Sequence, residues 1–326
     1  MTPANEPPPV APVTRPEGPV PRGVVVAGEA LIDLIEQSDG RLLPHLGGSP
    51  WNLARALGRL GCSVRYLNPL SSDEFGGQLA AALAESKVRC VGERSAMPTS
   101  LAVVRIDAWG QPAYVFYREG VADRDLAPET LLSQWPSEAS LFHVGSLAVM
   151  PPDGQAWLRT LAALVARGVS TSVDINMRPR VACNAADLAD YAALSRRILS
   201  QGRIIKVSDE DLRTLELPGD PLAQARGLLN EVTQVVVLTL GAEGAWGLTR
   251  ECEHFQSAAQ VRVVDTVGAG DCFYAGFLSY LLEQGALDRR DAPARDLVAA
   301  ALAFGNQVTA HNLQRAGCQP PWRHEL

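Results

Sequence analysis

Lysine is almost missing from this chain of 326 residues, and arginine supplies nearly all of its basic charge. The two lysines are Lys87 and Lys206, and neither follows a glycine-rich loop. Because a P-loop nucleotide site requires a lysine at the end of such a loop, this class of NTPase is excluded. The dinucleotide-binding pattern is missing as well, since Gly268 and Gly270 are followed by Phe273 where a third glycine should stand.

The chain also lacks paired cysteines, long apolar runs and an excess of positive charge. Its six cysteines are scattered without a C-x-x-C pair, which argues against a zinc site and a disulfide scaffold and favours the reducing cytoplasm. No run approaches the ~18 apolar residues of a membrane helix. The net charge of −7 disfavours binding to nucleic acids and to anionic membranes. We therefore expect small molecules as partners.

Proline is concentrated at the N-terminus, where it occupies eight of the first 22 residues. This composition predicts a disordered tail over 1–22, and the tail lacks the apolar stretch of a signal peptide. We expect residues 23–318 to form one domain and 319–326 to form a C-terminal tail.

Short β-branched runs alternate with amphipathic helical patterns from residue 24 onward. This alternation predicts an α/β fold with a mostly parallel sheet, right-handed crossovers and helices on both faces. The expected strands are 24–28, 64–67, 141–144, 170–174, 203–207 and 235–239. The expected helices are 52–60, 78–86, 155–167, 187–200, 222–231 and 291–311.

Two segments interrupt the alternation. Residues 31–46 and about 99–120 are typical of β-hairpins, with turns at 38–40 and near 109–112. The two hairpins could pair into a small second sheet, or each could remain an ordinary hairpin at the edge of the main sheet.

The most informative segment surrounds two closely spaced glycines. A short β-type run over 261–264 leads to a turn with Gly268, Ala269 and Gly270, and a helix then begins with Asp271 in its first turn. The N–H groups of such a turn form an anion site at the helix N-terminus. A carboxylate beside this site suits a general base that works next to a transferring phosphoryl group. The same Asp271 could instead be only a helix cap.

Two other segments place polar groups where a ligand could bind. Gly47 and Gly48 permit close approach of the backbone, and Asn52 opens the following helix, where it could also be a cap. Asp33 follows the first buried strand, and ligands of open parallel sheets bind at the carboxyl ends of strands. Its carboxylate could accept two hydrogen bonds from vicinal hydroxyl groups.

Together these segments resemble the ribokinase-like (PfkB) carbohydrate kinases. Residues 265–271 match D-T-x-G-A-G-D, residues 47–54 match G-G-x-x-x-N-x-A, and G-E-A-L-I-D at 28–33 is close to the fructokinase branch. The resemblance implies an ATP-dependent sugar kinase with Asp271 as the base. It also implies that the hairpins form a lid over the sugar, which two subunits of a homodimer often share.

The resemblance further implies a set of residues around the two substrates. The catalytic group comprises Gly268, Ala269, Gly270 and Asp271. The sugar side comprises Asp33, Gly47, Gly48, Asn52, Arg118 and, in a D-x-N-x-R segment, Asn176 and Arg178. The ATP side comprises Ser208, Asn306 and, in T-x-G-x-x-G, Thr239, Gly241 and Gly244.

Metal binding is expected at two carboxylates. Many relatives carry N-x-x-E, which helps to hold hydrated magnesium, whereas this chain reads S-x-x-D and keeps the carboxylate as Asp211 without the amide. Asp265 is an additional charged candidate, and relatives often bind a monovalent cation nearby. The implied cofactors are ATP and Mg²⁺, with K⁺ as a further candidate.

The sugar itself is indicated by residues 115–124, which resemble bacterial fructokinases and favour fructose. An F-Y-R run also occurs in relatives that act on 2-keto-3-deoxygluconate, where an arginine meets a carboxylate, so that substrate is the alternative. A nucleoside kinase of the same fold and a non-catalytic sugar-binding regulator are further alternatives. Phosphorylated sugars are disfavoured because no basic cluster lies near Asn52 or Asp33.

Overall fold

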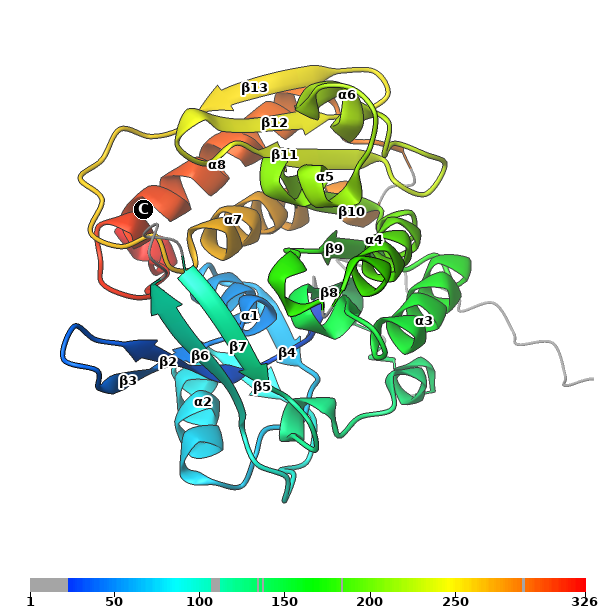
Figure 1. The fold of residues 1–326 in the computed structure, drawn as a ribbon. Coiled ribbons are helices and arrows are strands. Elements are labelled where there is room, and N and C mark those ends of the chain that lie inside the picture. Colours follow the sequence, from blue (N-terminus) through cyan, green and yellow to red (C-terminus); the bar gives the residue numbers. More distant parts are fainter. Residues whose placement is uncertain (1–22, 107–111, 134, 137, 183, 289–290) are drawn as a thin grey trace, which may run out of the picture.

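The computed structural model describes residues 23–106, 112–133, 135–136, 138–182, 184–288 and 291–326 (Figure 1). The expected N-terminal tail and most of the turn expected near 109–112 lie outside these residues. Within them, no helix is long and apolar enough to cross a membrane.

A sheet of nine strands forms the centre of the molecule, in the order β13-β12-β11-β10-β9-β8-β1-β4-β5. Neighbouring strands from β11 to β5 are parallel, and only β12 and β13 at one edge pair antiparallel. The strands are β1 (Gly23–Ala27), β4 (Ser63–Tyr66), β5 (Val88–Cys90), β8 (Ala139–Gly145), β9 (Ser170–Asp174), β10 (Ile204–Ser208), β11 (Val235–Thr239), β12 (Gly244–Leu248) and β13 (Glu253–Ser257). The mostly parallel α/β sheet expected from the sequence is confirmed.

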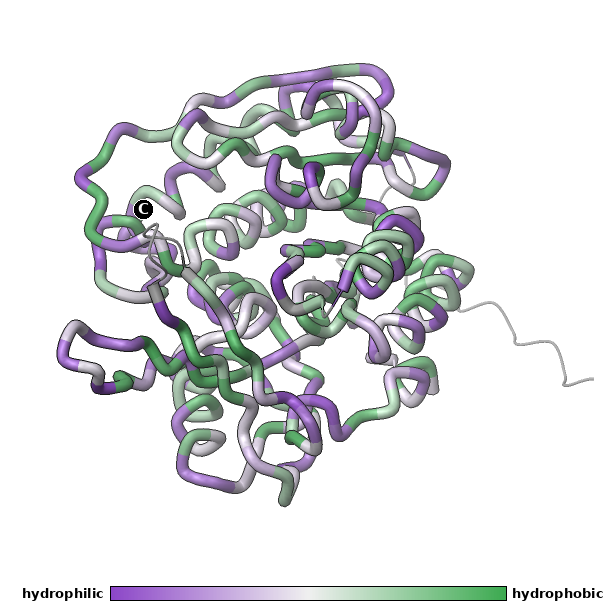
Figure 2. The backbone as a smooth tube through the Cα atoms, in the orientation of Figure 1, coloured by the Kyte–Doolittle hydropathy of each residue, from purple (hydrophilic) through white to green (hydrophobic). Residues whose placement is uncertain are grey.

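Helices cover both faces of this sheet (Figure 1). One face carries α1 (Ser49–Arg59), α2 (Glu74–Glu85), α7 (Ala269–Glu283) and α8 (Arg295–Leu313), and the other carries α3 (Gly154–Ala166), α4 (Ala185–Leu199), α5 (Asp209–Leu215) and α6 (Pro221–Arg226). Because side chains alternate along a strand, Val24 and Val26 of β1 enter the first core, and Val25 and Ala27 enter the second. The strands are therefore apolar on both sides, and β11 is coloured mostly as hydrophobic in Figure 2.

The two hairpins form a second sheet of four strands, in the order β3-β2-β6-β7, which we call the lid sheet. Its strands are β2 (Leu31–Glu36), β3 (Leu42–Gly47), β6 (Ser100–Ile106) and β7 (Pro112–Tyr117). Parallel pairing of β2 with β6 joins the hairpins. The small second sheet is thereby confirmed, and the alternative of two separate edge hairpins is not.

Two expected elements differ from the structure. Residues 261–264 are not a strand: this run has no strand neighbour, and Val263 and Val264 are 54% and 57% exposed. β-branched residues favour strands only where a neighbouring strand and a core can receive them. The helix expected over 222–231 is shorter than expected, because α6 ends at Arg226 and Gly227 is its C-cap.

The C-terminal residues, expected to be a tail over 319–326, are packed against the domain. Arg59 Nη1 donates a hydrogen bond of 2.9 Å to the Pro320 carbonyl, and its guanidinium lies 5.2 Å from the centre of the Trp322 ring. Gln307 of α8 donates to the carbonyl of Leu326. Side chains of α1 and α8 thus hold this segment in place.

Candidate active site

The first turn of α7 is shaped by Gly268. This residue has a φ of 69°, in the left-handed region that favours glycine, and it is the N-cap of the helix. A Cβ atom at Gly268 would overlap the Sγ of Cys318, so a larger residue does not fit. The turn thereby presents its backbone at the positive end of the α7 dipole, as an anion site requires.

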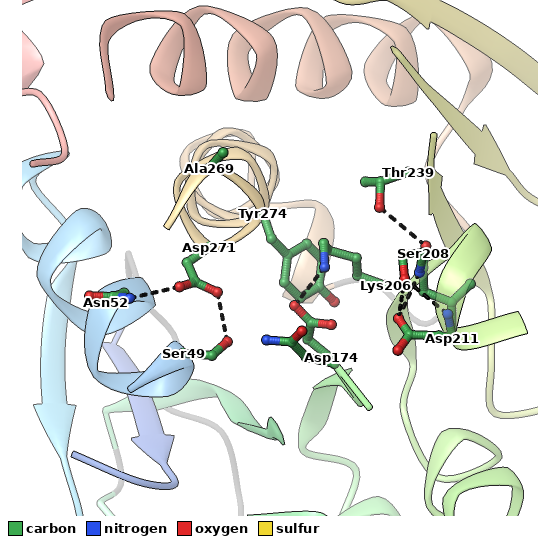
Figure 3. Close-up of polar contacts among 12 residues, drawn as sticks. Ser49, Asn52, Asp174, Lys206, Ser208, Asp211, Thr239, Ala269, Asp271 and Tyr274 are labelled. Atoms are coloured by element: carbon green, nitrogen blue, oxygen red, sulfur yellow. Dashed lines mark hydrogen bonds and ion pairs between the residues drawn. The ribbon is translucent and has the colours of Figure 1, made fainter. Parts of the chain in front are cut away.

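Asp271 lies in this turn with both carboxylate oxygens held by α1 (Figure 3). Ser49 Oγ donates to Oδ1 over 2.6 Å, and Asn52 Nδ2 donates to Oδ2 over 2.9 Å, although these residues are more than 200 positions away in the chain. Neither of these two hydrogen bonds comes from the backbone of α7. Its carboxylate is therefore fixed by the neighbouring helix α1, a contact beyond what a helix cap requires.

The pKa of Asp271 is raised above its ordinary value. Burial raises it, and the hydrogen bonds from Ser49 and Asn52, together with the charges of Lys206 and Arg178, lower it by less. A carboxylate with a raised pKa accepts a proton more readily than an exposed one, which suits a general base.

Asp33 of β2 brings a second buried carboxylate to the same region. Burial raises its pKa to about 6, the charge of Arg178 lowers it, and the charge of Asp271 raises it. These couplings place the lid sheet, the loop after β9 and the first turn of α7 within electrostatic reach of one another. Gly47 leaves room for Asp33, because a Cβ atom at this position would overlap Asp33 Oδ2 unless the carboxylate moved.

Gly48 connects β3 to α1 in an unusual backbone conformation. Its φ is 110°, and a Cβ atom would overlap the backbone carbonyl of Glu29. The glycine therefore lets the chain turn sharply and present Ser49 and Asn52 to Asp271.

Asn176 and Arg178 lie in the loop after β9 and act together. Asn176 has a φ of 38°, and its Oδ1 accepts a hydrogen bond of 2.6 Å from Arg178 Nη1. The Arg178 guanidinium lies 5.7 Å from the centre of the Tyr114 ring in β7. Asn176 thus orients Arg178, and Arg178 contacts the lid sheet.

Arg118 is held at the base of the lid sheet. Its Nη2 pairs with Asp123 over 2.9 Å, and its Nη1 donates to the carbonyl of Leu147 over 3.1 Å. It also borders a cleft of about 850 Å³ that Phe116 and Met150 help to line. These contacts of Arg118 do not include Asp271. Its charge lowers the pKa of buried Glu29, which burial raises to about 7.

Four buried polar atoms around this region have no hydrogen-bond partner among the described residues. They are Glu29 Oε2, Asn52 Oδ1, Arg118 Nε and Asp174 Oδ1. A buried polar atom without a partner costs free energy, so such atoms are uncommon unless a ligand or water completes them. Each of these four atoms could form a hydrogen bond with a bound ligand or water.

The residues expected on the ATP side follow the carboxyl ends of β10 and β11 or lie close to β13. Thr239 ends β11, and Gly241 and Gly244 take φ angles of 55° and 136° in the following turn. Asn306 of α8 accepts a hydrogen bond from the Ala259 N–H and donates one to the Ser257 carbonyl. Both ends of its amide are therefore used to hold the backbone after β13.

Asp211, expected as a metal ligand, is engaged by the protein itself. Its Oδ2 accepts hydrogen bonds of 2.8 Å from the N–H and the hydroxyl of Ser208, and its Oδ1 accepts one of 2.7 Å from the Met177 N–H. Ser208 and Asp211 form the capping box of α5.

Asp265, the other expected metal ligand, is engaged in the same way. It accepts hydrogen bonds from the N–H groups of Val267 and Gly317. Among the described residues, no group of three or more histidine, cysteine, aspartate or glutamate side chains could hold a metal ion. Within the described part of the chain, the side chains therefore form no metal cage of their own.

Two features of the site were not anticipated. Ser49 orients Asp271, and Lys206 Nζ forms a buried ion pair of 2.8 Å with Asp174 Oδ2 (Figure 3). The position of Ser49 directly after Gly47-Gly48 and the rarity of lysine were the available signals. Neither signal specifies a contact with a distant segment.

Comparison with known proteins identifies the family of the chain. The family described as pfkB family carbohydrate kinase matches residues 22–325. The chain is 34% identical to a fructokinase from Rhizobium leguminosarum bv. trifolii over 281 residues, which cover 84% of each chain.

Two solved structures share the fold. The crystal structure of fructokinase with bound ATP from Xylella fastidiosa superposes with a TM-score of 0.81 and 29% identity, covering 91% of this chain and 94% of that one. Fructokinase from Vibrio cholerae O395, in its fructose, ADP and calcium ion bound form, gives a TM-score of 0.77 and 26% identity, covering 92% of this chain and 95% of that one. This chain belongs to the pfkB family of carbohydrate kinases.

Proposed function

We propose that this protein is an ATP-dependent fructokinase, which transfers the γ-phosphoryl group of ATP to a hydroxyl group of fructose. The observation that carries this function is the buried carboxylate of Asp271, which α1 orients beside the N-terminus of α7. The similarity to fructokinases supports the choice of fructose, and the neighbour from Vibrio cholerae is described with fructose and ADP bound. A 2-keto-3-deoxygluconate kinase is not favoured by these similarities.

In the proposed reaction, Asp271 accepts the proton of the attacking hydroxyl group. The hydroxyl oxygen forms a bond to the γ-phosphorus as the bond from that phosphorus to the β-phosphate oxygen breaks, and ADP leaves. The turn formed by Gly268, Ala269 and Gly270 stabilises the negative charge on the transferring group through its backbone N–H groups and the α7 dipole.

The sugar is bound between the lid sheet and the main body. Asp33 accepts hydrogen bonds from sugar hydroxyl groups, and the free Oδ1 of Asn52 provides another acceptor. Arg178, oriented by Asn176, donates to sugar oxygens, and Arg118 frames the cleft at the lid base. Gly47 and Gly48 keep the backbone close to the ligand. Closure of the lid excludes water, which otherwise competes as the acceptor.

ATP lies against the carboxyl ends of β10 and β11, near Thr239, Gly241 and Gly244, with Ser208 and Asn306 shaping the surrounding backbone. Mg²⁺ enters as the complex with ATP and is held mainly by phosphate oxygens and water, as is usual for this ion. Asp211 can contribute through its hydration shell. K⁺ is a candidate near Asp265, where backbone carbonyls would bind it.

We also propose that the protein is a cytoplasmic homodimer. Val115 and Tyr117 of β7 alternate onto one face of the lid sheet and are 54% and 59% exposed, and Leu42 of β3 is 42% exposed. Apolar side chains gathered on a sheet face favour burial against another protein surface. A second copy meeting this face would share the lid between two subunits.

A substrate panel tests the function. ATP consumption by the purified protein should be fastest with fructose, compared with 2-keto-3-deoxygluconate, ribose, tagatose and adenosine. A preference for 2-keto-3-deoxygluconate or adenosine would replace fructose as the substrate. No consumption with any acceptor would favour the non-catalytic regulator.

A further inference from the structure

We propose that Lys206 is a further catalytic residue whose ammonium group contacts the γ-phosphoryl group of ATP from the side of the sheet. This role rests on the proposed kinase function and assigns a second source of positive charge to the phosphoryl site, in addition to the first turn of α7. The contact is formed in the ATP complex and is absent with ADP.

The register of β10 directs Lys206 toward α7. Side chains two positions apart in a strand share a face, so Lys206 lies on the same face as Ile204. Ile204 belongs to the core that α7 covers, and Tyr274 of α7 donates a hydrogen bond of 3.0 Å to its carbonyl. Lys206 comes near the carboxyl end of the strand, where ligands of parallel sheets bind.

The ammonium group lies beside the turn that the anion site requires. A Cβ atom built on Gly270 would be 3.6 Å from both Nζ and Cε of Lys206. Since Gly270 has no side chain, the space between the turn and the ammonium group is not filled from that residue. A phosphoryl group at the α7 N-terminus would therefore approach Lys206 Nζ.

The hydrogen bonds of Lys206 leave capacity for a ligand. Asp174 is directly opposite Lys206 in the pairing of β9 with β10, and the two side chains are 2% and 6% exposed. An ammonium group carries three donors, and among the described residues Nζ uses one of them, toward Asp174 Oδ2. Asp174 Oδ1 is buried without a partner. Asp174 thus holds one side of the ammonium group while two donors remain.

The carboxylates around Lys206 favour the ionised form of its side chain. Burial alone would lower the pKa of Lys206, but the carboxylates of Asp174, Asp211 and Asp271 together hold it above its ordinary value. An arriving phosphoryl group adds negative charge to a site that already contains these three carboxylates. The ammonium group offsets that charge directly, whereas its removal leaves only the first turn of α7 to do so.

The choice of lysine at this position is itself informative. Of the 29 basic residues in the chain, only two are lysine, and Lys206 is the buried one. The ammonium group is a compact point charge with rotatable donors, whereas a guanidinium is a larger planar fork. A compact cation suits the space between Asp174 and the first turn of α7.

The test compares the double variant Lys206→Met/Asp174→Asn with Asp174→Asn alone. Because position 174 is neutral in both proteins, neither contains a buried carboxylate there that has lost its ammonium partner. Turnover is measured with fructose, and calorimetry measures the Kd values of ADP and of a nonhydrolysable ATP analogue. Relative to Asp174→Asn, the double variant should lose about 10²–10³-fold in kcat, the range for removal of one donor to a developing charge. The Kd of the analogue should rise by about tenfold or more, as for a lost hydrogen bond to a charged group, while the Kd of ADP stays unchanged.

Lys87→Met provides the control, because Lys87 is the other lysine and lies on the surface against Trp322. It should match the wild type in every measurement. If the double variant fails to fold, Lys206→Gln is compared with the wild type instead, because its amide can still donate to Asp174 while the positive charge is removed. The same changes in kcat and in the Kd of the analogue are expected.

Equal weakening of ADP and the analogue would show a structural role for Lys206 and overturn the assignment. Unchanged affinity for the analogue would overturn it too, because the γ-phosphoryl group would then not be contacted. These outcomes differ from failure of the proposed function, which would appear as a wild-type protein that does not phosphorylate fructose.

Discussion

The main body and the lid sheet each bring one buried carboxylate to the site, and they hold it differently. Asp271 of the main body receives hydrogen bonds on both oxygens, from Ser49 and Asn52. Asp33 of the lid sheet receives none from the described residues, and its pKa is set chiefly by burial and then by the charges of Arg178 and Asp271. A carboxylate oriented in advance suits proton transfer, whereas one with free oxygens suits the binding of hydroxyl groups. The comparison therefore separates a chemical role from a binding role.

Replacing the oriented carboxylate should have the larger effect. Asp271→Asn keeps the size of the side chain but cannot accept a proton, and general-base catalysis is typically worth about 10²–10⁴-fold in rate. We expect kcat with fructose to fall within that range while the melting temperature holds or rises slightly, because a buried charge is removed. Retention of more than about a tenth of wild-type kcat would contradict the role of Asp271 as the base.

Replacing the free carboxylate should change binding instead. Asp33→Ala removes acceptors for sugar hydroxyl groups, and a hydrogen bond to a charged group is worth about 1.5–3 kcal/mol, or roughly 10–150-fold. The KM for fructose should rise within that range, with ATP binding close to normal. Asp39→Ala, in the exposed turn of the same hairpin, is the matched control and should leave KM unchanged. A wild-type KM for fructose in Asp33→Ala would remove Asp33 from the sugar site.

Removing one of the two hydrogen bonds to Asp271 should leave its carboxylate less firmly oriented, as that of Asp33 is. Ser49→Ala deletes the donor at 2.6 Å, so we expect kcat to fall by about tenfold, the lower end for a hydrogen bond to a charged group. The Ser49 hydrogen bond lowers the pKa of Asp271, so its loss should shift the acidic limb of the rate profile to higher pH. Steady-state rates across pH would detect both changes. An unchanged kcat together with an unchanged limb would show that Ser49 does not orient the base.

The smallest effect is expected outside both regions. Deletion of residues 1–22, whose proline content predicts no packed structure, should leave the melting temperature and kcat nearly unchanged. A drop of several degrees in thermal unfolding would show that the segment stabilises the domain.

Local patterns predicted much of the fold because they report local physics. The strands at 170–174 and 235–239 have the predicted bounds, because each is a short buried segment that contains β-branched residues and ends at a turn. Residues 261–264 have similar composition but no neighbouring strand, and composition alone cannot supply one. The short glycine-containing motifs likewise located the α7 turn, because its geometry depends on adjacent residues.

Contacts between distant segments could not be predicted in the same way. The hydrogen bond from Ser49 to Asp271 spans 222 positions, and the Lys206–Asp174 pair depends on the register of two strands. The capping box that Asp211 forms with Ser208 was not predicted either, because a carboxylate that caps its own helix cannot be distinguished in sequence from one that is free to bind a ligand.

The pH dependence of single-turnover phosphoryl transfer, at saturating ATP and fructose, tests the role of Asp271 most directly. Only the deprotonated carboxylate can accept the proton, and its pKa is raised, so the rate should fall as pH drops through that pKa, by up to tenfold per unit below it. The same limb should be missing from the residual rate of Asp271→Asn. Identical acidic limbs in the wild type and Asp271→Asn would contradict the assignment of Asp271 as the general base.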